Sequence, residues 1–307
     1  MKIQGVTLSL GSLENSYPHT HKGIEFLLII KGSVVINIDD VDYNIKEDDI
    51  VLIHHQQIHY IKQVTNNVAL LVKVSNDFLN DNWTDYSSTS FLPCNSALEN
   101  QEDSHYFELK RLIIRLMLCY WQKNEGYALE FQSLLFQLFF QTKQHFTIKC
   151  TNQTSKPLKE KENDLSVVLN YINDNFTETI TLPEVSSLLY MTPQYFSKYF
   201  KEKTGISFLN YLMKLRLEHA VEELLSTDNS IIKISLNNGF ANTKSFRKVF
   251  LDTYQTSPGE YRKKHQKTIV EPDDAINPFN IEDNDKQDLL RYIRQHQLIN
   301  EQSEWIG

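Results

Sequence analysis

Two groups of polar residues in this sequence have types and spacings that could do chemistry. One lies on a repeat, because YFSKYF at residues 195–200 returns as SFRKVF at residues 245–250. Lysine and arginine bind phosphates and guanine edges, and amides pair with adenine, so basic residues on duplicated segments favour DNA binding. The other group is His19, His21, Glu25 and His59. Three imidazoles and a carboxylate suit a divalent metal, or the polar lining of a small-molecule pocket.

Each copy of the repeat has the pattern of a short apolar helix, a turn and a second helix with a basic, polar exposed face. This is the layout of a helix-turn-helix, whose second helix enters the major groove. In the first copy Thr181 and Glu184 form a capping box for a helix over 182–189. Thr192 caps a helix over 193–204, with Pro193 at its first position and Gly205 as its left-handed end.

A long helix over 208–225 joins the two copies and predicts a rigid strut. Asp228 or Ser230 opens the second copy, and Asn242 caps a helix over 243–254. The repeat offset grows from forty-nine to fifty along the copies, so the second turn is one residue longer than the first. The two recognition helices are then expected about one DNA turn apart, near 34 Å.

Residues 1–75 have an all-β pattern that predicts a small sandwich or barrel. Short apolar segments at 25–30, 33–38, 43–45, 50–53 and 68–74 are separated by turn signals. His19, His21, Glu25, Gly32 and the later His59 resemble the two cupin motifs, HxHx3Ex6G and a distal histidine. In metal-binding cupins the matching positions hold one divalent ion, but here HHQQ at 54–57 replaces the proline- and glycine-rich stretch. We expect an effector pocket at these four residues, and Fe, Mn, Ni, Cu or Zn binding is the alternative.

Residues 76–104 predict no regular structure, and two helices follow at 106–122 and 127–146. Their apolar stripes are broader than one sheet face needs, which favours a hairpin that pairs with a second subunit to form a homodimer. The alternative is that the whole hairpin packs on the barrel. The residues off the main stripes that favour the dimer are Ile114, Met117, Leu118, Phe136 and Phe140.

Length and charge agree with a two-domain protein that binds DNA through one domain. The chain has 307 residues and a formal net charge of −8, but residues 159–267 carry 15 Lys and Arg against 13 Asp and Glu. No apolar run could span a bilayer, no secretory signal is recognisable, and three widely spaced cysteines fit no metal pattern. We therefore expect a cytoplasmic protein with no membrane partner and no cofactor.

Residues 180–208 and 231–262 resemble the tandem DNA-binding domain of the AraC/XylS family of bacterial transcription regulators. The resemblance rests on FKEKTGIS at 200–207, Leu215-Arg216, Gly239-Phe240 and SPGEYR at 257–262. Gln255, Lys244 and Leu251 depart from the family pattern. The resemblance implies a non-enzymatic regulator that contacts double-stranded promoter DNA through Thr192, Gln194, Tyr195, Ser197, Lys198, Lys201, Asn242, Thr243, Lys244, Arg247 and Lys248.

These observations predict an α+β multidomain chain with an N-terminal cupin-like β-barrel, a helical dimerisation hairpin and an all-α tandem helix-turn-helix domain. The expected boundaries are 1–146 for the sensor, 147–161 for a linker, 162–266 for the DNA-binding domain and 267–307 for an acidic extension. That extension could dock on the sensor, oligomerise, mimic phosphate or remain unordered. We expect an effector-responsive activator that contacts RNA polymerase. The alternatives are a metal-binding cupin enzyme or metal sensor with a DNA-binding domain, and a constitutive DNA-bending protein.

Overall fold

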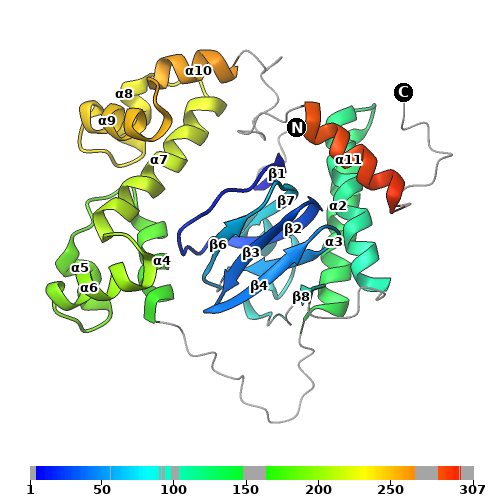
Figure 1. Ribbon diagram of the computed structural model, residues 1–307, viewed down its shortest axis with the longest axis horizontal. Coiled ribbons are helices and arrows are strands. Elements are labelled where there is room, and N and C mark those ends of the chain that lie inside the picture. Colours follow the sequence, from blue (N-terminus) through cyan, green and yellow to red (C-terminus); the bar gives the residue numbers. More distant parts are fainter. Residues whose placement is uncertain are drawn as a thin grey trace, which may run out of the picture.

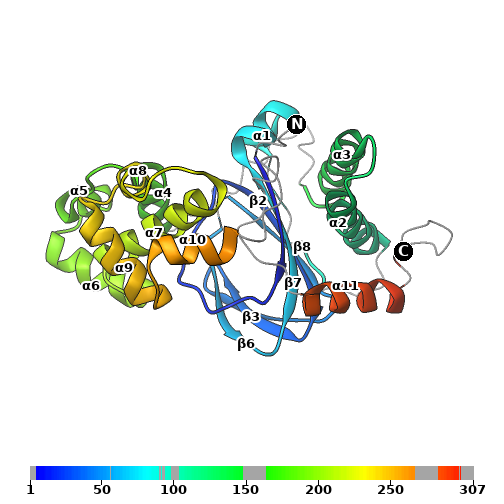
Figure 2. The same ribbon diagram turned by 90° about the horizontal axis from the view of Figure 1, so that it is seen from above.

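The computed structural model describes residues 5–55, 57–89, 91, 94–97, 104–147, 164–266, 283–296 and 298. Two facing β-sheets form the centre of the molecule, and helices lie on either side of them (Figures 1 and 2). The cupin-like β-domain followed by a helical helix-turn-helix region confirms the predicted fold class. The predicted linker falls almost entirely outside the described residues.

The two sheets are antiparallel wherever their strands pair. One has the order β1-β7-β2-β5-β8 and the other the order β4-β3-β6. Apolar side chains of both sheets fill the space between them, including Leu27, Ile36 and Ile53. The strands are β1 (Val6–Gly11), β2 (Gly23–Lys31), β3 (Ser33–Ile38), β4 (Val41–Lys46), β5 (Ile50–His54), β6 (His59–Val64), β7 (Val68–Ser75) and β8 (Cys94–Asn95).

Sequence reasoning missed β1 and β6. β1 alternates buried and half-buried residues over its whole length, the pattern of a strand with one face on the core. The expectation of no regular structure over 76–104 is also wrong in part. Within its described residues the structure has α1 (Asn76–Asn82), a 3-10 turn η1 (Tyr86–Ser88) and β8. Ser75 caps α1 by accepting a hydrogen bond from the Phe78 amide, which helps the helix begin there.

The predicted hairpin is α2 (Ser104–Gln122) and α3 (Tyr127–His145), and it covers the outer face of the larger sheet (Figure 2). Ile114, Met117 and Leu118 are buried in the core that the hairpin shares with that sheet. They are therefore not free for a second subunit, and this part of the dimer argument is wrong. Phe136 and Phe140 are 43% and 58% exposed, so the remaining part of the argument stands as a prediction.

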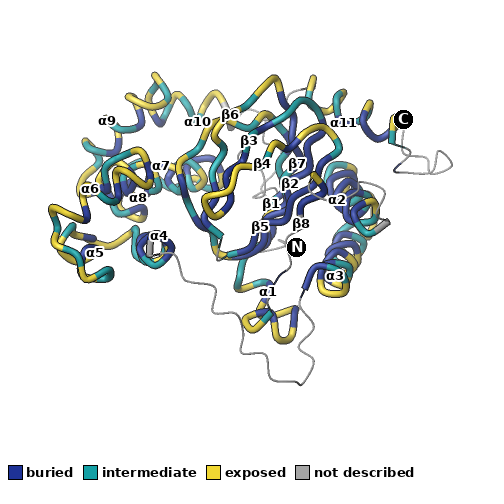
Figure 3. Tube along the Cα trace, turned by 60° about the horizontal axis from the view of Figure 1, so that its bottom comes forward, coloured by how far each residue is buried: buried dark blue, intermediate teal, exposed yellow. Residues whose placement is uncertain are grey.

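The helices after the linker form two small cores at the two ends of α7 (Figure 1). Phe196 and Phe200 are buried in the first core, and Phe246 and Phe250 in the second. The strands are mostly buried, whereas these helices mix exposed and buried positions (Figure 3). The helices are α4 (Asp164–Asn175), α5 (Leu182–Leu188), α6 (Pro193–Thr204), α7 (Phe208–Ser226), α8 (Ile231–Asn237), α9 (Thr243–Tyr254) and α10 (Pro258–Gln266).

The acidic extension contributes α11 (Asp283–Gln295), which returns to the β-domain and lies beside α2 (Figure 1). Leu289 and Tyr292 are fully buried in the same core as the hairpin. Asp48 in the β4–β5 turn accepts hydrogen bonds from the Tyr292 hydroxyl and from the Lys110 ammonium of α2. Of the roles predicted for the acidic extension, docking on the N-terminal domain is the one that these contacts support. No helix among the described residues is long and apolar enough to cross a membrane.

Candidate DNA-contacting helices and effector site

The first helix-turn-helix is α5 and α6, and short-range hydrogen bonds set its ends. Thr181 and Glu184 make the reciprocal capping box at the start of α5. Thr192 accepts the Tyr195 amide at the start of α6, where Pro193 is the first residue. Gly205 ends α6 with φ of 79°, the left-handed conformation that glycine adopts at low cost. All of these local predictions are confirmed.

The second helix-turn-helix, α8 and α9, is built in the same way with two differences. Ser230, rather than Asp228, caps α8, and Asn242 caps α9 by accepting the Ser245 amide at 2.9 Å. The turn from Asn238 to Asn242 is one residue longer than its counterpart, as the repeat predicts. Gln255 ends α9 with φ of 54°, so the left-handed end is kept without the glycine.

The predicted DNA-contacting residues lie on or just before α6 and α9, and all but one of them are exposed. Thr243 is half-buried, and the others are exposed: Thr192, Gln194, Tyr195, Ser197, Lys198, Lys201, Asn242, Lys244, Arg247 and Lys248. The oxygens of Thr192 and Asn242 are already used as caps, but the threonine hydroxyl hydrogen and the asparagine amide group remain available as donors. The two helices can therefore present a row of donors and cations to an acidic polymer.

The basic residues of the two helices differ in their ion pairs. Lys198 on α6 has Glu202 one turn away, with Nζ 3.8 Å from Oε1. Lys203, at the end of α6, lies 3.6 Å from Asp40 of the β-domain. Lys244, Arg247 and Lys248 on α9 make no ion pair with another described residue, so more of the cations on α9 are unpaired although both helices carry the same formal net charge.

The predicted effector residues come together where the chain before β2 meets β6. His19 and His59 pair through their backbones, and their ring centroids are 4.3 Å apart. His21 Nε2 lies 3.4 Å from Glu25 Oε2. His21, Glu25 and His59 each offer one ligand atom, and these atoms lie within 4.8 Å of one another. The structure thus brings all four predicted residues into one cluster.

Burial controls the charge of this cluster. It lowers the pKa of His21 to about 4, and it also lowers the pKa of His19 and His59. Burial alone would raise the pKa of Glu25, but Lys73 and the nearby imidazoles lower it well below its ordinary value. Because the histidines are neutral at pH 7, Lys73 is the cation that balances this carboxylate.

Lys73 is the site residue that sequence reasoning missed. The register of β2 against β7 places Lys73 opposite Glu25. The Lys73 Nζ lies 3.1 Å from Glu25 Oε2. The available signal was one lysine inside the apolar run at 68–74. Its partner could not be known without the strand pairing.

Two family models match this chain. An "AraC-like ligand binding domain" matches residues 9–139 and a "Helix-turn-helix domain" matches residues 185–264, which together cover about two thirds of the chain. The chain belongs to the AraC family.

Individual relatives are similar to this chain over part of their sequence and are longer than the matched part. The AraC-family chain is 25% identical over 240 residues to an uncharacterized HTH-type transcriptional regulator of Staphylococcus aureus, covering 78% of this chain and 31% of that protein. It is 36% identical over 113 residues to the regulatory protein PocR of Salmonella typhimurium, 37% of either chain. The chain therefore spans about a third of the length of these relatives.

Two solved structures resemble the AraC-family chain at low sequence identity. Apo ToxT of Vibrio cholerae has a TM-score of 0.46 and 15% identity, covering 86% of this chain and 99% of that one. The DNA-binding domain of AdpA, solved with a target DNA, has a TM-score of 0.33 and 23% identity, covering 34% and 95%.

In this AraC-family chain the segment that carries His19 and His21 also contacts α4. The Thr20 hydroxyl donates to Asn170 Oδ1 of α4 at 2.8 Å, and Asn173 Nδ2 donates to the Thr20 carbonyl at 2.9 Å. Lys22 pairs with Asp174 at the end of α4. These contacts were not predicted, because they join residues about 150 positions apart.

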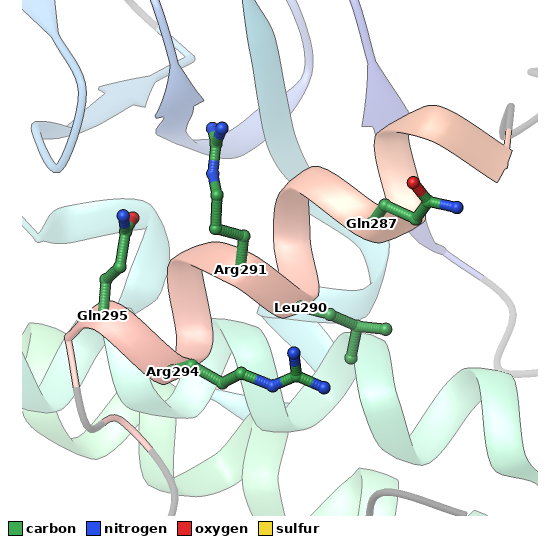
Figure 4. A pocket seen from close by; sticks show the side chains of 5 residues that line it. All are labelled: Gln287, Leu290, Arg291, Arg294 and Gln295. Carbon is green, nitrogen blue, oxygen red and sulfur yellow. The ribbon is translucent and has the colours of Figure 1, made fainter.

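A surface hollow of the AraC-family chain lies along α11, outside the predicted sites. Arg291 and Gln295 point to one side of the helix, and Arg294 and Leu290 point to another (Figure 4). Arg291 lies 3.3 Å from Asp288 of its own helix. The polar side chains that line this hollow are exposed, so none of them defines a buried ligand site.

Proposed function

We propose that this chain is a sequence-specific, DNA-binding transcription regulator, with α6 and α9 as its two recognition helices. The observation that carries the proposal is that two capped helices with exposed donors sit at the two ends of one rigid helix, α7. The 19 residues of α7 give it a length of about 28 Å. That length is close to one turn of B-DNA, roughly 34 Å, so both helices can reach successive major grooves on one face.

The residue chemistry supports a division of labour within this proposal. Gln194 can pair bidentately with adenine, and Lys198 and Arg247 can pair with guanine O6 and N7. Ser197, Thr243 and Lys201 fit phosphate contacts, which set register without reading sequence. Under this proposal residues 162–266 are the DNA-binding domain, and residues 1–146 hold the effector site. The regulator works in the cytoplasm, where bacterial promoter DNA lies.

A homodimer is part of the proposal, with the exposed side of the hairpin as its interface. Phe107, Leu129, Phe136 and Phe140 leave large apolar surface exposed on α2 and α3. A dimer would read a direct or inverted pair of sites. We propose activation through contact with RNA polymerase, in line with the usual role of the family. Sedimentation of Phe136→Glu plus Phe140→Glu tests the interface, and an unchanged mass would exclude it.

Binding to a duplex from the upstream region of its own gene tests the DNA-binding function. Lys198→Ala plus Arg247→Ala should weaken binding at least about 30-fold, because each side chain is expected to contribute 1–3 kcal/mol. Lys46→Ala is the matched control, since Lys46 is also exposed but lies on the β-domain. An affinity that neither changes with the double substitution nor depends on salt would exclude the groove model.

A further inference from the structure

His19 and His59 present lone pairs rather than hydrogens to the centre of the cluster. His19 Nδ1 lies 2.8 Å from the Tyr17 carbonyl, and His59 Nδ1 lies 3.2 Å from the Gln57 carbonyl. A carbonyl only accepts, so each Nδ1 carries the hydrogen and each Nε2 carries a lone pair. Metal-binding histidines are oriented by this same kind of contact.

His21 Nε2 and His59 Nε2 are buried without a hydrogen-bond partner, and the buried Glu25 Oε2 has the Lys73 ammonium 3.1 Å away as its ion-pair partner. His59 is 3% exposed and Glu25 is 7% exposed, so water does not satisfy them freely. At metal–ligand bonds of about 2.1 Å, two ligands of a tetrahedral ion lie roughly 3.4 Å apart. The separation of His21 Nε2 and Glu25 Oε2 is already 3.4 Å.

Among the described residues, the Lys73 ammonium is the cation paired with Glu25. Its side chain is 46% exposed, so the ammonium can leave without unfolding β7. Glu218 and Glu222 of α7 also attract it, since both raise its pKa after the larger effect of Glu25. Both carboxylates belong to α7, so the ammonium lies in the field of that helix as well as beside Glu25.

We propose that His21, Glu25 and His59, with His19 beside them, bind one divalent transition-metal ion, which displaces Lys73 from Glu25 and alters the contact with α4 and α7. Two imidazoles and a carboxylate leave at least one coordination position open, which His19 or a small ligand can fill. The metal site stands independently of the proposed function, while its regulatory effect rests on that function.

The segment 17–22 connects the site to the DNA-binding helices because its side chains alternate. His19 and His21 take part in the cluster, whereas Thr20 and Lys22 bind α4 through Asn170, Asn173 and Asp174. Tyr17 lies under the Lys214 ammonium of α7, with 3.9 Å between Nζ and the ring centroid. A shift of His19 and His21 onto an ion would therefore move Thr20 and Lys22, which bind α4.

Calorimetric titration of the chelator-treated full chain with Zn²⁺, Ni²⁺ and Mn²⁺ tests the site. We expect one ion per chain, with His21→Gln and His59→Gln each lowering the affinity at least 100-fold. His55→Gln is the control, because its ring faces Tyr86 instead. Absence of saturable binding, or an affinity of both variants equal to that of the unaltered chain, would overturn the proposal.

Two further measurements keep the test decisive if a histidine variant unfolds. Lys73→Met should bind the ion at least 10-fold more tightly, because the competing ammonium is gone; weaker or equal binding argues against displacement. Co²⁺ bound to the unaltered chain should have the visible spectrum of nitrogen and oxygen ligation. If sugars or other polyols stabilise the chain, metals do not, and His59→Gln removes the stabilisation, the proposal is overturned. The site would then bind a hydroxyl-rich ligand instead of an ion.

The regulatory effect is tested by DNA affinity measured with and without the ion. Asn173→Ala should keep metal binding and lose the metal-dependent change in DNA affinity. Metal binding with no change in the DNA affinity of the unaltered chain would overturn the regulatory half alone. Failure to bind DNA in any metal state would instead contradict the proposed function.

Discussion

Arg216 and Arg262 make equivalent contacts in the two halves of the DNA-binding region. Arg216 donates to the carbonyls of Phe176 and Glu178 after α4, and Arg262 donates to those of Leu224 and Asn229 around the end of α7. Each guanidinium thus satisfies backbone carbonyls near a helix end and ties the following helices to it. Arg216 is buried and bonded to the backbone in this way, so it is not available to read bases.

Arg216→Met should lower the free energy of unfolding by about 3 kcal/mol. The substitution removes two charge-assisted hydrogen bonds and leaves both carbonyls without these donors in a buried place, since Arg216 is 6% exposed. Urea unfolding measures the change. Arg247→Met, at an exposed position, is expected to stay within about 0.5 kcal/mol of the parent.

Gly239→Ala should destabilise the chain much more than Gly205→Ala, although both glycines have positive φ. A Cβ at Gly239 would lie 2.6 Å from the Phe176 carbonyl oxygen, whereas nothing lies within 4 Å of one at Gly205. We expect about 1 kcal/mol of destabilisation at Gly205 and at least about 3 kcal/mol at Gly239. Thermal unfolding of the two variants side by side makes the comparison, and equal losses would contradict this close approach.

The salt dependence of DNA binding should change more with Lys248→Ala than with Lys198→Ala. Glu202 pairs with Lys198, whereas Lys248 makes no ion pair with another described residue. Loss of one phosphate contact lowers the slope of log K against log salt by about 0.9. Fluorescence anisotropy between low and moderate salt measures both slopes. A larger effect of Lys198→Ala would reverse the expected roles of the helices.

Stability should fall as the pH drops from 7 to 5, and His54 should account for part of the loss. Burial, with His55 and His21 nearby, lowers the pKa of His54 to about 4 in the folded chain. The unfolded chain then binds more protons over this interval, so the contribution of His54 is complete above about 6.5 and is lost on acidification. We expect a loss of about 2 kcal/mol at pH 5. His54→Gln should flatten the curve measured by urea unfolding.

Tyr292→Ala should release α11 from the β-domain while leaving the two sheets folded. The side chain is fully buried and its hydroxyl donates to Asp48, so its removal costs about 4 kcal/mol of local stability. Hydrogen exchange of residues 283–296 reports the release. Leu290→Ala, at a half-buried position on the same helix, is the control and should change exchange little. Simultaneous loss of protection in β2 would mean that α11 is essential to the core.

The sequence by itself determined the features that depend on neighbours a few positions away. Thr181 with Glu184, Thr192 with Pro193, and Asn242 all cap the helices as predicted, because a cap binds an amide two or three residues on. The spacing of His19, His21, Glu25 and His59 also predicted one cluster correctly.

Only the tertiary structure decided the contacts between distant segments. It placed Lys73 opposite Glu25, since a strand register depends on partners that composition does not name. It buried Ile114, Met117 and Leu118 in the core shared with the sheet, which the apolar pattern alone assigned to a dimer interface. It also joined Thr20 to α4 and Tyr292 to Asp48. Such pairings depend on how whole elements pack, and local periodicity specifies which face of a helix is apolar but not what covers it.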